Sequence, residues 1–100
     1  MKKYKVRLNP KAFRDIEDIF KYISMEIHAP DAAKNQTDRI WKALKTLEKF
    51  PNAHQDRIVG KYAKKGYKQL LIDNYMAIYK INEEEKWVNI ITVIYQGCNI

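Results

Sequence analysis

The sequence predicts an α+β fold in which a helical hairpin packs on one face of a small antiparallel sheet. Three observations support it: strict alternation of apolar and basic residues over 3–8, two stretches of helical spacing between 10 and 50, and three strand-like runs after 66. The resulting order of strand, helix, helix and three-stranded meander is that of a two-layer sandwich. A chain of 100 residues has room for one domain, which we assign to residues 1–100.

The first predicted strand and the first predicted helix are separated by Asn9-Pro10. In the strand, Tyr4, Val6 and Leu8 share one face, and basic side chains occupy the other. Asparagine suits a helix N-cap, and proline suits the first helical position because its missing N–H is not needed there. The helix then has a broad apolar stripe, made of Ala12, Phe13, Ile16, Ile19, Phe20, Ile23 and Ile27.

The second predicted helix begins at the break Ala29-Pro30-Asp31. Its stripe runs from Ala33 to Leu47 and ends near Phe50, where Pro51-Asn52 stops it. Because the break between the two helices is short, we expect an antiparallel hairpin.

Three predicted strands complete the chain: Tyr67–Ile72, Tyr75–Ile81 and Trp87–Tyr95. Short turns at Asp73-Asn74 and at 82–86 join them into a meander. The last two strands are apolar on both faces, although two helices cover only one face of a sheet. Either the 51–66 loop and the helix ends cover the second face, or that face is a docking groove for a partner chain.

The charge of the chain is uneven. It carries 19 Lys+Arg against 12 Asp+Glu, a formal net charge of +7, and two stretches, 1–14 and 57–72, contain no acid. Such a basic surface indicates an anionic partner, either nucleic acid or an acidic protein. No stretch has the length of a membrane span, and the single cysteine, Cys98, excludes an internal disulfide. We therefore expect a cytoplasmic protein that contacts no membrane.

Few residues suggest chemistry. No spaced Cys/His set, acidic metal loop or glycine-rich phosphate loop occurs, so we expect no metal and no cofactor. The remaining pattern is one of lysines interleaved with tyrosines, which is compatible with metal-free RNA cleavage or with nucleic-acid binding. The candidate catalytic residues are Lys68, Lys64, Tyr95 and His54; the candidate nucleic-acid- or target-binding residues are Lys61, Lys64, Lys65, Lys68 and Tyr67.

The whole chain resembles the RelE/ParE superfamily, the toxins of bacterial toxin–antitoxin modules. Four segments carry the resemblance: the opening 4–12, the first-helix pattern 15–23, the 47–51 motif that ends in proline, and the core 66–81 that includes Gly66, Asn74-Tyr75 and Tyr79. Val93-Ile94-Tyr95 stands where the family has a similar closing motif. Each motif is weak alone, but their order and spacing together indicate membership.

The resemblance implies a toxin held inactive by a small, partly acidic antitoxin that wraps it, with operator DNA bound only through that complex. We expect the antitoxin to seat on the sheet face that the helices leave uncovered. The expected residues are Met76, Ile78, Ile90 and Ile94; if the helices cover that face instead, the seat lies at Ile91 and Val93.

The chain departs from the ribonuclease branch of the family. Met76 stands where that branch has arginine after the strand tyrosine, Lys68 replaces another arginine, and the end of the chain lacks arginine and histidine. The ParE-like branch, whose members act on DNA gyrase by protein contact, is closer. The alternatives are a ribosome-dependent mRNA endoribonuclease and a degenerate member without toxicity.

Overall fold

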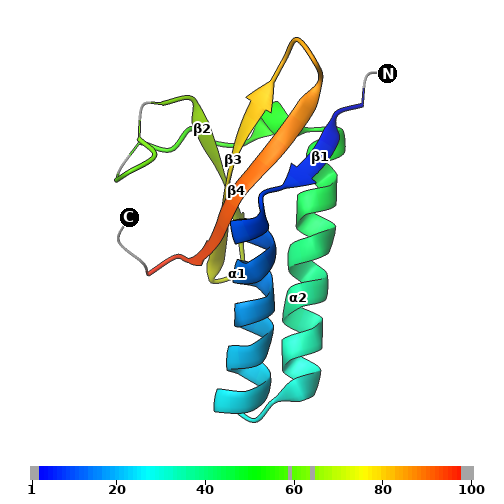
Figure 1. Cartoon of the computed structure of the whole chain (residues 1–100), viewed down its shortest axis with the longest axis vertical. Coiled ribbons are helices and arrows are strands. Elements are labelled where there is room, and N and C mark those ends of the chain that lie inside the picture. Colours follow the sequence, from blue (N-terminus) through cyan, green and yellow to red (C-terminus); the bar gives the residue numbers. More distant parts are fainter. Residues whose placement is uncertain (1–2, 59, 64, 98–100) are drawn as a thin grey trace.

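The computed structural model describes residues 3–58, 60–63 and 65–97, and it contains a hairpin of two helices beside a four-stranded sheet (Figure 1). In chain order the elements are β1 (Lys5–Leu8), α1 (Pro10–Lys21), a π-helical turn (Tyr22–Glu26), α2 (Pro30–Lys45), short 3-10 turns at Thr46–Glu48 and Pro51–Ala53, β2 (Tyr67–Ile72), β3 (Tyr75–Asn82) and β4 (Trp87–Tyr95). The predicted α+β class and element order are confirmed.

The sheet has the strand order β1-β4-β3-β2 and is mixed rather than wholly antiparallel. The meander pairs are antiparallel as expected, but β1 lies parallel to β4, with Val6 opposite Val88 and Leu8 opposite Ile90. No turn links β1 to β4, so the sequence carried no signal for the direction of this pair. The parallel pairing follows from the two helices, because they carry the chain back toward the start of β1 before the meander begins.

The two helices pack side by side, and their connection extends past the sheet at the bottom of Figure 1. Pro10 is the first residue of α1, and Asn9 precedes it in an extended conformation; the Asn9 backbone N–H donates to the Ile90 carbonyl (2.9 Å), whereas its side chain makes no capping bond. The end of α1 widens into the π-helical turn, and His28 adopts a left-handed φ of 58° at the hairpin connection. The hairpin gives the molecule its elongated extents of 44 × 31 × 21 Å.

The core lies between the helices and one sheet face, which we call the helix face. Side chains alternate along each strand, so one set of residues from every strand points to the helices. The core consists of Ala12, Ile16, Ile40, Leu44 and Leu47 from the helical part of the chain and Leu70, Ile72, Ala77, Tyr79, Val88, Ile90 and Val93 from the sheet.

A bulge in β4 changes which of its residues face the helices. Ile78 pairs with Thr92 while Tyr79 pairs with Ile90, so Ile91 is an extra residue in β4. Strict alternation would place Ile90 and Val93 on opposite faces. With the bulge both belong to the core, and Ile94 lies on the other face.

The second sheet face, here called the open face, is partly covered by the loop that precedes β2. Residues 55–57 run along the outer edge of β2: the Arg57 N–H donates to the Tyr67 carbonyl (2.8 Å) and the Gln69 N–H to the Gln55 carbonyl (2.9 Å). The Arg57 side chain, itself buried, then reaches Gln69 Oε1 (3.1 Å) and the Met76 sulfur (3.5 Å). This loop therefore covers the apolar residues of β3 on the open face.

Candidate functional site

Lys68, the central catalytic candidate, has a structural role. It lies on the helix face at the start of β2, and its Nζ forms an ion pair with Asp56 Oδ1 (2.9 Å) and donates to the His54 carbonyl (3.1 Å). The side chain is only 20% exposed. Lys68 thus holds the 54–57 segment against the sheet edge, and its positive charge is already neutralised by a carboxylate.

His54 packs against the core on one side and lines a small hollow of about 220 Å³ with Gln55 and Gln69 on the other. Its ring meets the Tyr79 ring edge-on, with centroids 6.4 Å apart, and the Tyr79 hydroxyl donates to the Pro51 carbonyl (2.6 Å). Partial burial, and secondarily the nearby Lys68 charge, lower the pKa of His54 below its ordinary value. Burial also raises the pKa of Tyr79 well above its ordinary range, so this hydroxyl stays protonated.

The lowered pKa of His54 predicts that acid weakens the contact between the 54–57 segment and the sheet. His54 binds a proton at a higher pH in the unfolded chain than in the folded chain. The stability that neutral His54 contributes is therefore fully present above the pKa of the unfolded chain, and it is lost as the pH falls below that pKa. We expect the free energy of unfolding to fall between pH 7.5 and pH 5, and we expect His54→Gln to reduce that slope. Urea titrations at both pH values test this; equal slopes for the two proteins would contradict it.

Tyr95 lies far from the other catalytic candidates. It pairs with Tyr75 across the sheet, whereas Lys68 pairs with Tyr79, four residues further along β3. Four residues of strand span ~13 Å, with two strand spacings in addition. The Tyr95 ring instead packs edge-on against the Tyr75 ring, with centroids 6.0 Å apart. Lys64 lies outside the described residues, and the three described candidates do not form one catalytic group.

The predicted binding residues are divided between the two faces. Lys61 and Tyr67 belong to an aromatic cluster at the open face, where Lys61 lies 5.7 Å from the Tyr62 ring and the Tyr62 and Tyr67 rings are 5.1 Å apart. Lys65 is exposed in the turn before β2. Lys68 points to the opposite face because neighbouring strand residues alternate.

The predicted antitoxin seat is also divided. Met76 and Ile78 do share the open face, but they are 4% and 0% exposed. Ile94 lies on the same face and is half-buried. Ile90 was wrongly placed with them: it is fully buried in the core on the helix face, because the bulge at Ile91 breaks the alternation on which the prediction rested.

A groove that the sequence did not reveal lies between the helical hairpin and the far end of the sheet. It has a volume of about 640 Å³, and we call it the hairpin–sheet groove. Exposed apolar side chains from the π-helical turn, the hairpin connection and the end of β4 surround it, and two acids stand on its α1 side. Its lining residues include Ile19, Tyr22, Ile27, Tyr75, Tyr95, Asp15 and Asp18.

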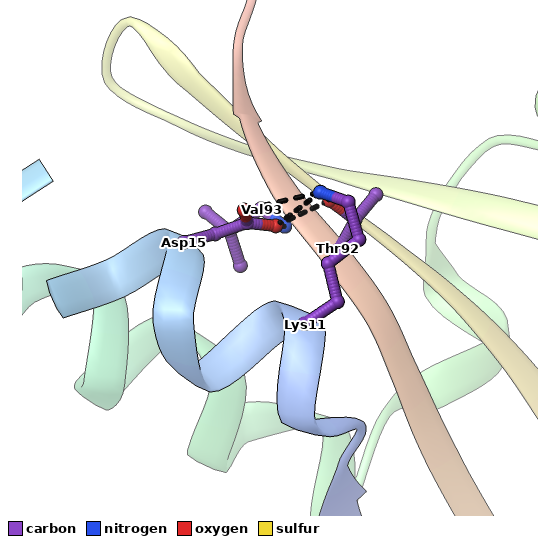
Figure 2. Close-up of polar contacts among 4 residues, drawn as sticks. All are labelled: Lys11, Asp15, Thr92 and Val93. Atoms are coloured by element: carbon purple, nitrogen blue, oxygen red, sulfur yellow. Dashed lines mark hydrogen bonds and ion pairs between the residues drawn. The ribbon is translucent and has the colours of Figure 1, made fainter. Parts of the chain in front are cut away.

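Asp15 joins the groove to the bulge in β4 (Figure 2). One carboxylate oxygen accepts hydrogen bonds from the Thr92 hydroxyl and from the Val93 backbone N–H (3.1 Å), and Lys11 Nζ pairs with the same carboxylate (3.0 Å). Lys11 Nζ also donates to the Thr92 hydroxyl oxygen (2.9 Å). These contacts fix α1 to the one irregular point of β4, so they set the width of the groove.

Apolar residues near the end of the first helix were the available signal for this groove. Tyr22 and Ile27, which line it, are 57% and 54% exposed. The sequence placed Ile27 in the apolar stripe of the helix and Tyr22 outside it, and only the wider π-helical turn shows that both leave the core. The contact of Asp15 with Thr92 joins residues 77 positions apart and has no local signature.

The fold is that of several solved bacterial and archaeal toxin structures. The ParDE toxin–antitoxin system of P. aeruginosa includes a chain that is 18% identical, with a TM-score of 0.75 over 92% of this chain and 95% of that one. The RelBE2 complex of Mycobacterium tuberculosis (19% identity, TM-score 0.65, 93% and 98% coverage) and the RelE–RelB complex of Pyrococcus horikoshii (16%, 0.64, 95% and 97%) are similar too. At these identities the likeness establishes the fold.

The sequence itself gives the family. Residues 6–99 match the model of the ParE toxin of the type II toxin–antitoxin system parDE. The chain therefore belongs to the ParE toxin family, and it is the toxin component of a type II toxin–antitoxin module. No curated protein is a significant match to the sequence.

The described part of the chain has neither a candidate membrane span nor a candidate metal site. None of its helices is long and apolar enough to cross a membrane. Nor does it bring together three or more histidine, cysteine or acidic side chains in a way that could hold a metal ion.

Proposed function

We propose that this toxin inhibits growth by binding a protein target such as DNA gyrase, and not by cleaving RNA. The observation that carries the proposal is the position of Lys68, whose ammonium group is bound to Asp56 and to the His54 carbonyl. Metal-free RNA cleavage needs a base, an acid and a stabilising cation around one phosphate. Among the described candidates, Lys68 and Tyr95 lie at different ends of the sheet.

The antitoxin is proposed to neutralise the toxin by covering the hairpin–sheet groove with an apolar segment. Several of the most exposed large apolar side chains of the described residues surround this groove, including Tyr22, Ile27 and Tyr95. An exposed apolar surface of this kind is typical of an interaction site. Asp18 at its edge favours a basic residue in the bound segment. By contrast, Met76 and Ile78 are already covered by the chain itself.

Induced expression with pulse labelling tests the proposed mode of action. We expect DNA synthesis to fall before protein synthesis, and we expect Lys68→Ala and Tyr95→Phe to retain growth inhibition, provided circular dichroism shows that both variants fold. Early loss of protein labelling, with cleaved mRNA and inactive Lys68→Ala, would establish the ribonuclease reading instead. A wild-type chain that leaves growth unchanged would overturn toxicity altogether.

A further inference from the structure

A row of polar and aromatic side chains crosses the open face from edge to edge. Tyr67 on β2 pairs with Lys80 on β3, Lys80 pairs with Asn89 on β4, and Asn89 pairs with Arg7 on β1. Arg7, Lys80 and Asn89 point away from the helices, because their strand neighbours are core residues or pack against the core. Tyr67 shares their face because it pairs directly with Lys80. With strands ~4.8 Å apart, the row is about 14 Å long.

A second row lies beside the first and carries the same kinds of group. Lys5 pairs with Trp87, and Trp87 pairs with Asn82. The Arg7 guanidinium lies 5.0 Å from the centre of the Trp87 ring, just as Lys80 Nζ lies 5.2 Å from the Tyr67 ring in the first row. The two rows together are here called the sheet platform. It consists of Lys5, Trp87 and Asn82 in one row and Arg7, Asn89, Lys80 and Tyr67 in the other.

The platform is concave and open. A hollow of about 460 Å³ lies over its β3–β4 part. Lys80, Asn82, Trp87 and Asn89 line this hollow, and Glu83 and Glu84 close it at the turn. Lys5, Arg7 and Lys80 are exposed, whereas Trp87 and Asn89 are half-buried and form the floor. The platform therefore combines exposed cations with aromatic rings and carboxamides.

Two features of the chain limit the platform. Beyond Tyr67 and Lys80, the Arg57 side chain covers the open face at Met76. At the β3–β4 turn three acids end the platform: Glu83 accepts a hydrogen bond from the Tyr4 hydroxyl (2.6 Å), Glu85 accepts one from the Trp87 indole N–H (2.9 Å), and Glu84 is exposed. An anionic ligand is thereby directed onto the rows and away from the turn.

We propose that the sheet platform binds single-stranded nucleic acid, without cleaving it. The three cations are placed to contact phosphates. Arg7 lies over the Trp87 ring and Lys80 over the Tyr67 ring, and bases stack on such guanidinium and aromatic surfaces. Asn89 offers a donor and an acceptor to a base edge, and Asn82 offers its amide donor, because its carboxamide oxygen already accepts from the Glu85 N–H (2.9 Å). Four-stranded sheets with exposed aromatic residues accept about two or three unstacked bases in this way.

An acidic peptide fits the platform less well. Its carboxylates would use the cations but would make no use of the aromatic rings or of the Asn89 carboxamide. Nucleic acid uses all three kinds of group at once. The sheet platform plays no part in the proposed inhibition of growth through a protein target. The two proposals are therefore tested by separate experiments.

Fluorescence anisotropy with labelled 12-nucleotide oligomers of dT and of U tests the platform. We expect both to bind, with an affinity that falls as salt rises; the stronger of the two identifies DNA or RNA as the preferred ligand. Arg7→Ala and Lys80→Ala should each reduce the salt slope by about 0.7. Tyr67→Leu should weaken binding about fivefold or more. Lys42→Ala, which removes an exposed cation from α2, is the matched control and should behave as wild type.

A second measurement reports stacking directly. The chain has two tryptophans, so in Trp41→Phe the emission comes from Trp87 alone. We expect the oligomers to quench this emission and a polyglutamate peptide of equal charge to leave it unchanged. Absence of oligomer binding, equal losses in Lys80→Ala and Lys42→Ala, or equal binding and quenching by polyglutamate would each overturn the proposal.

Discussion

Ile90→Asp is expected to unfold the protein, whereas Ile94→Asp is expected to leave it folded. The Ile90 side chain is fully buried between the sheet and the helices, and it lies opposite both Leu8 and Tyr79. A carboxylate there has no partner and no water, which is among the most destabilising changes known. Ile94 lies on the open face and is half-buried, so its replacement keeps a path to solvent.

Urea unfolding followed by circular dichroism measures both effects. The milder pair Ile90→Ala and Ile94→Ala provides a readout if Ile90→Asp is insoluble. We expect a loss of about 2–5 kcal/mol for Ile90→Ala, and a clearly smaller loss for Ile94→Ala. Equal losses at the two positions would contradict the bulge at Ile91 and the division of faces that follows from it.

Asp15→Ala is expected to lower the free energy of unfolding by about 3 kcal/mol. The substitution leaves the Val93 N–H and the Thr92 hydroxyl without their acceptor, and each loss of this kind costs about 1–3 kcal/mol where water does not replace it. It also frees α1 from the bulge in β4. We therefore expect weaker antitoxin binding as well, because the hairpin–sheet groove loses its fixed width.

Asp38→Ala is the matched control for Asp15→Ala. Asp38 forms an i,i+4 ion pair with Lys34 on α2, but both side chains are largely exposed, at 50% and 73%. Exposed pairs of this type contribute little, so we expect a change below about 0.5 kcal/mol in urea unfolding. If the two variants lost the same stability, the Asp15 contacts would not be an anchor between helix and sheet.

Much of the fold could be predicted from local patterns. The strands Tyr67–Ile72 and Trp87–Tyr95 have the predicted bounds, and β3 ends one residue later than expected. The helical hairpin begins at Pro10 and turns at Pro30 because proline is compatible with the first turn of a helix and not with its interior. These signals depend on residues close in sequence, which is why they were readable.

The faces of the sheet were harder to predict. Alternation assigns a face only while every residue pairs, and the extra residue Ile91 shifts the remainder of β4. The 51–66 loop was one of two expected covers for the second face, but nothing in the sequence indicated that the Arg57 side chain would cover Met76. Both features arise from contacts between distant segments, for which the sequence carries no periodic signal.

The candidate site was predicted least well, for the same reason. Lys68 and Tyr67 are neighbours in the sequence and were grouped, but in a strand they point to opposite faces. Conversely, Arg7, Asn89 and Lys80 are far apart in the sequence and lie in one row across the sheet. A functional surface on a sheet follows strand register, which only the structure supplies.

The most direct test of the proposed function is a DNA supercoiling assay with purified gyrase and purified toxin. A toxin that acts by protein contact predicts inhibition that rises with toxin concentration, that persists in Lys68→Ala and that disappears when the cognate antitoxin is added. Supercoiling that stays unchanged at toxin concentrations well above that of gyrase would contradict gyrase as the target of this chain.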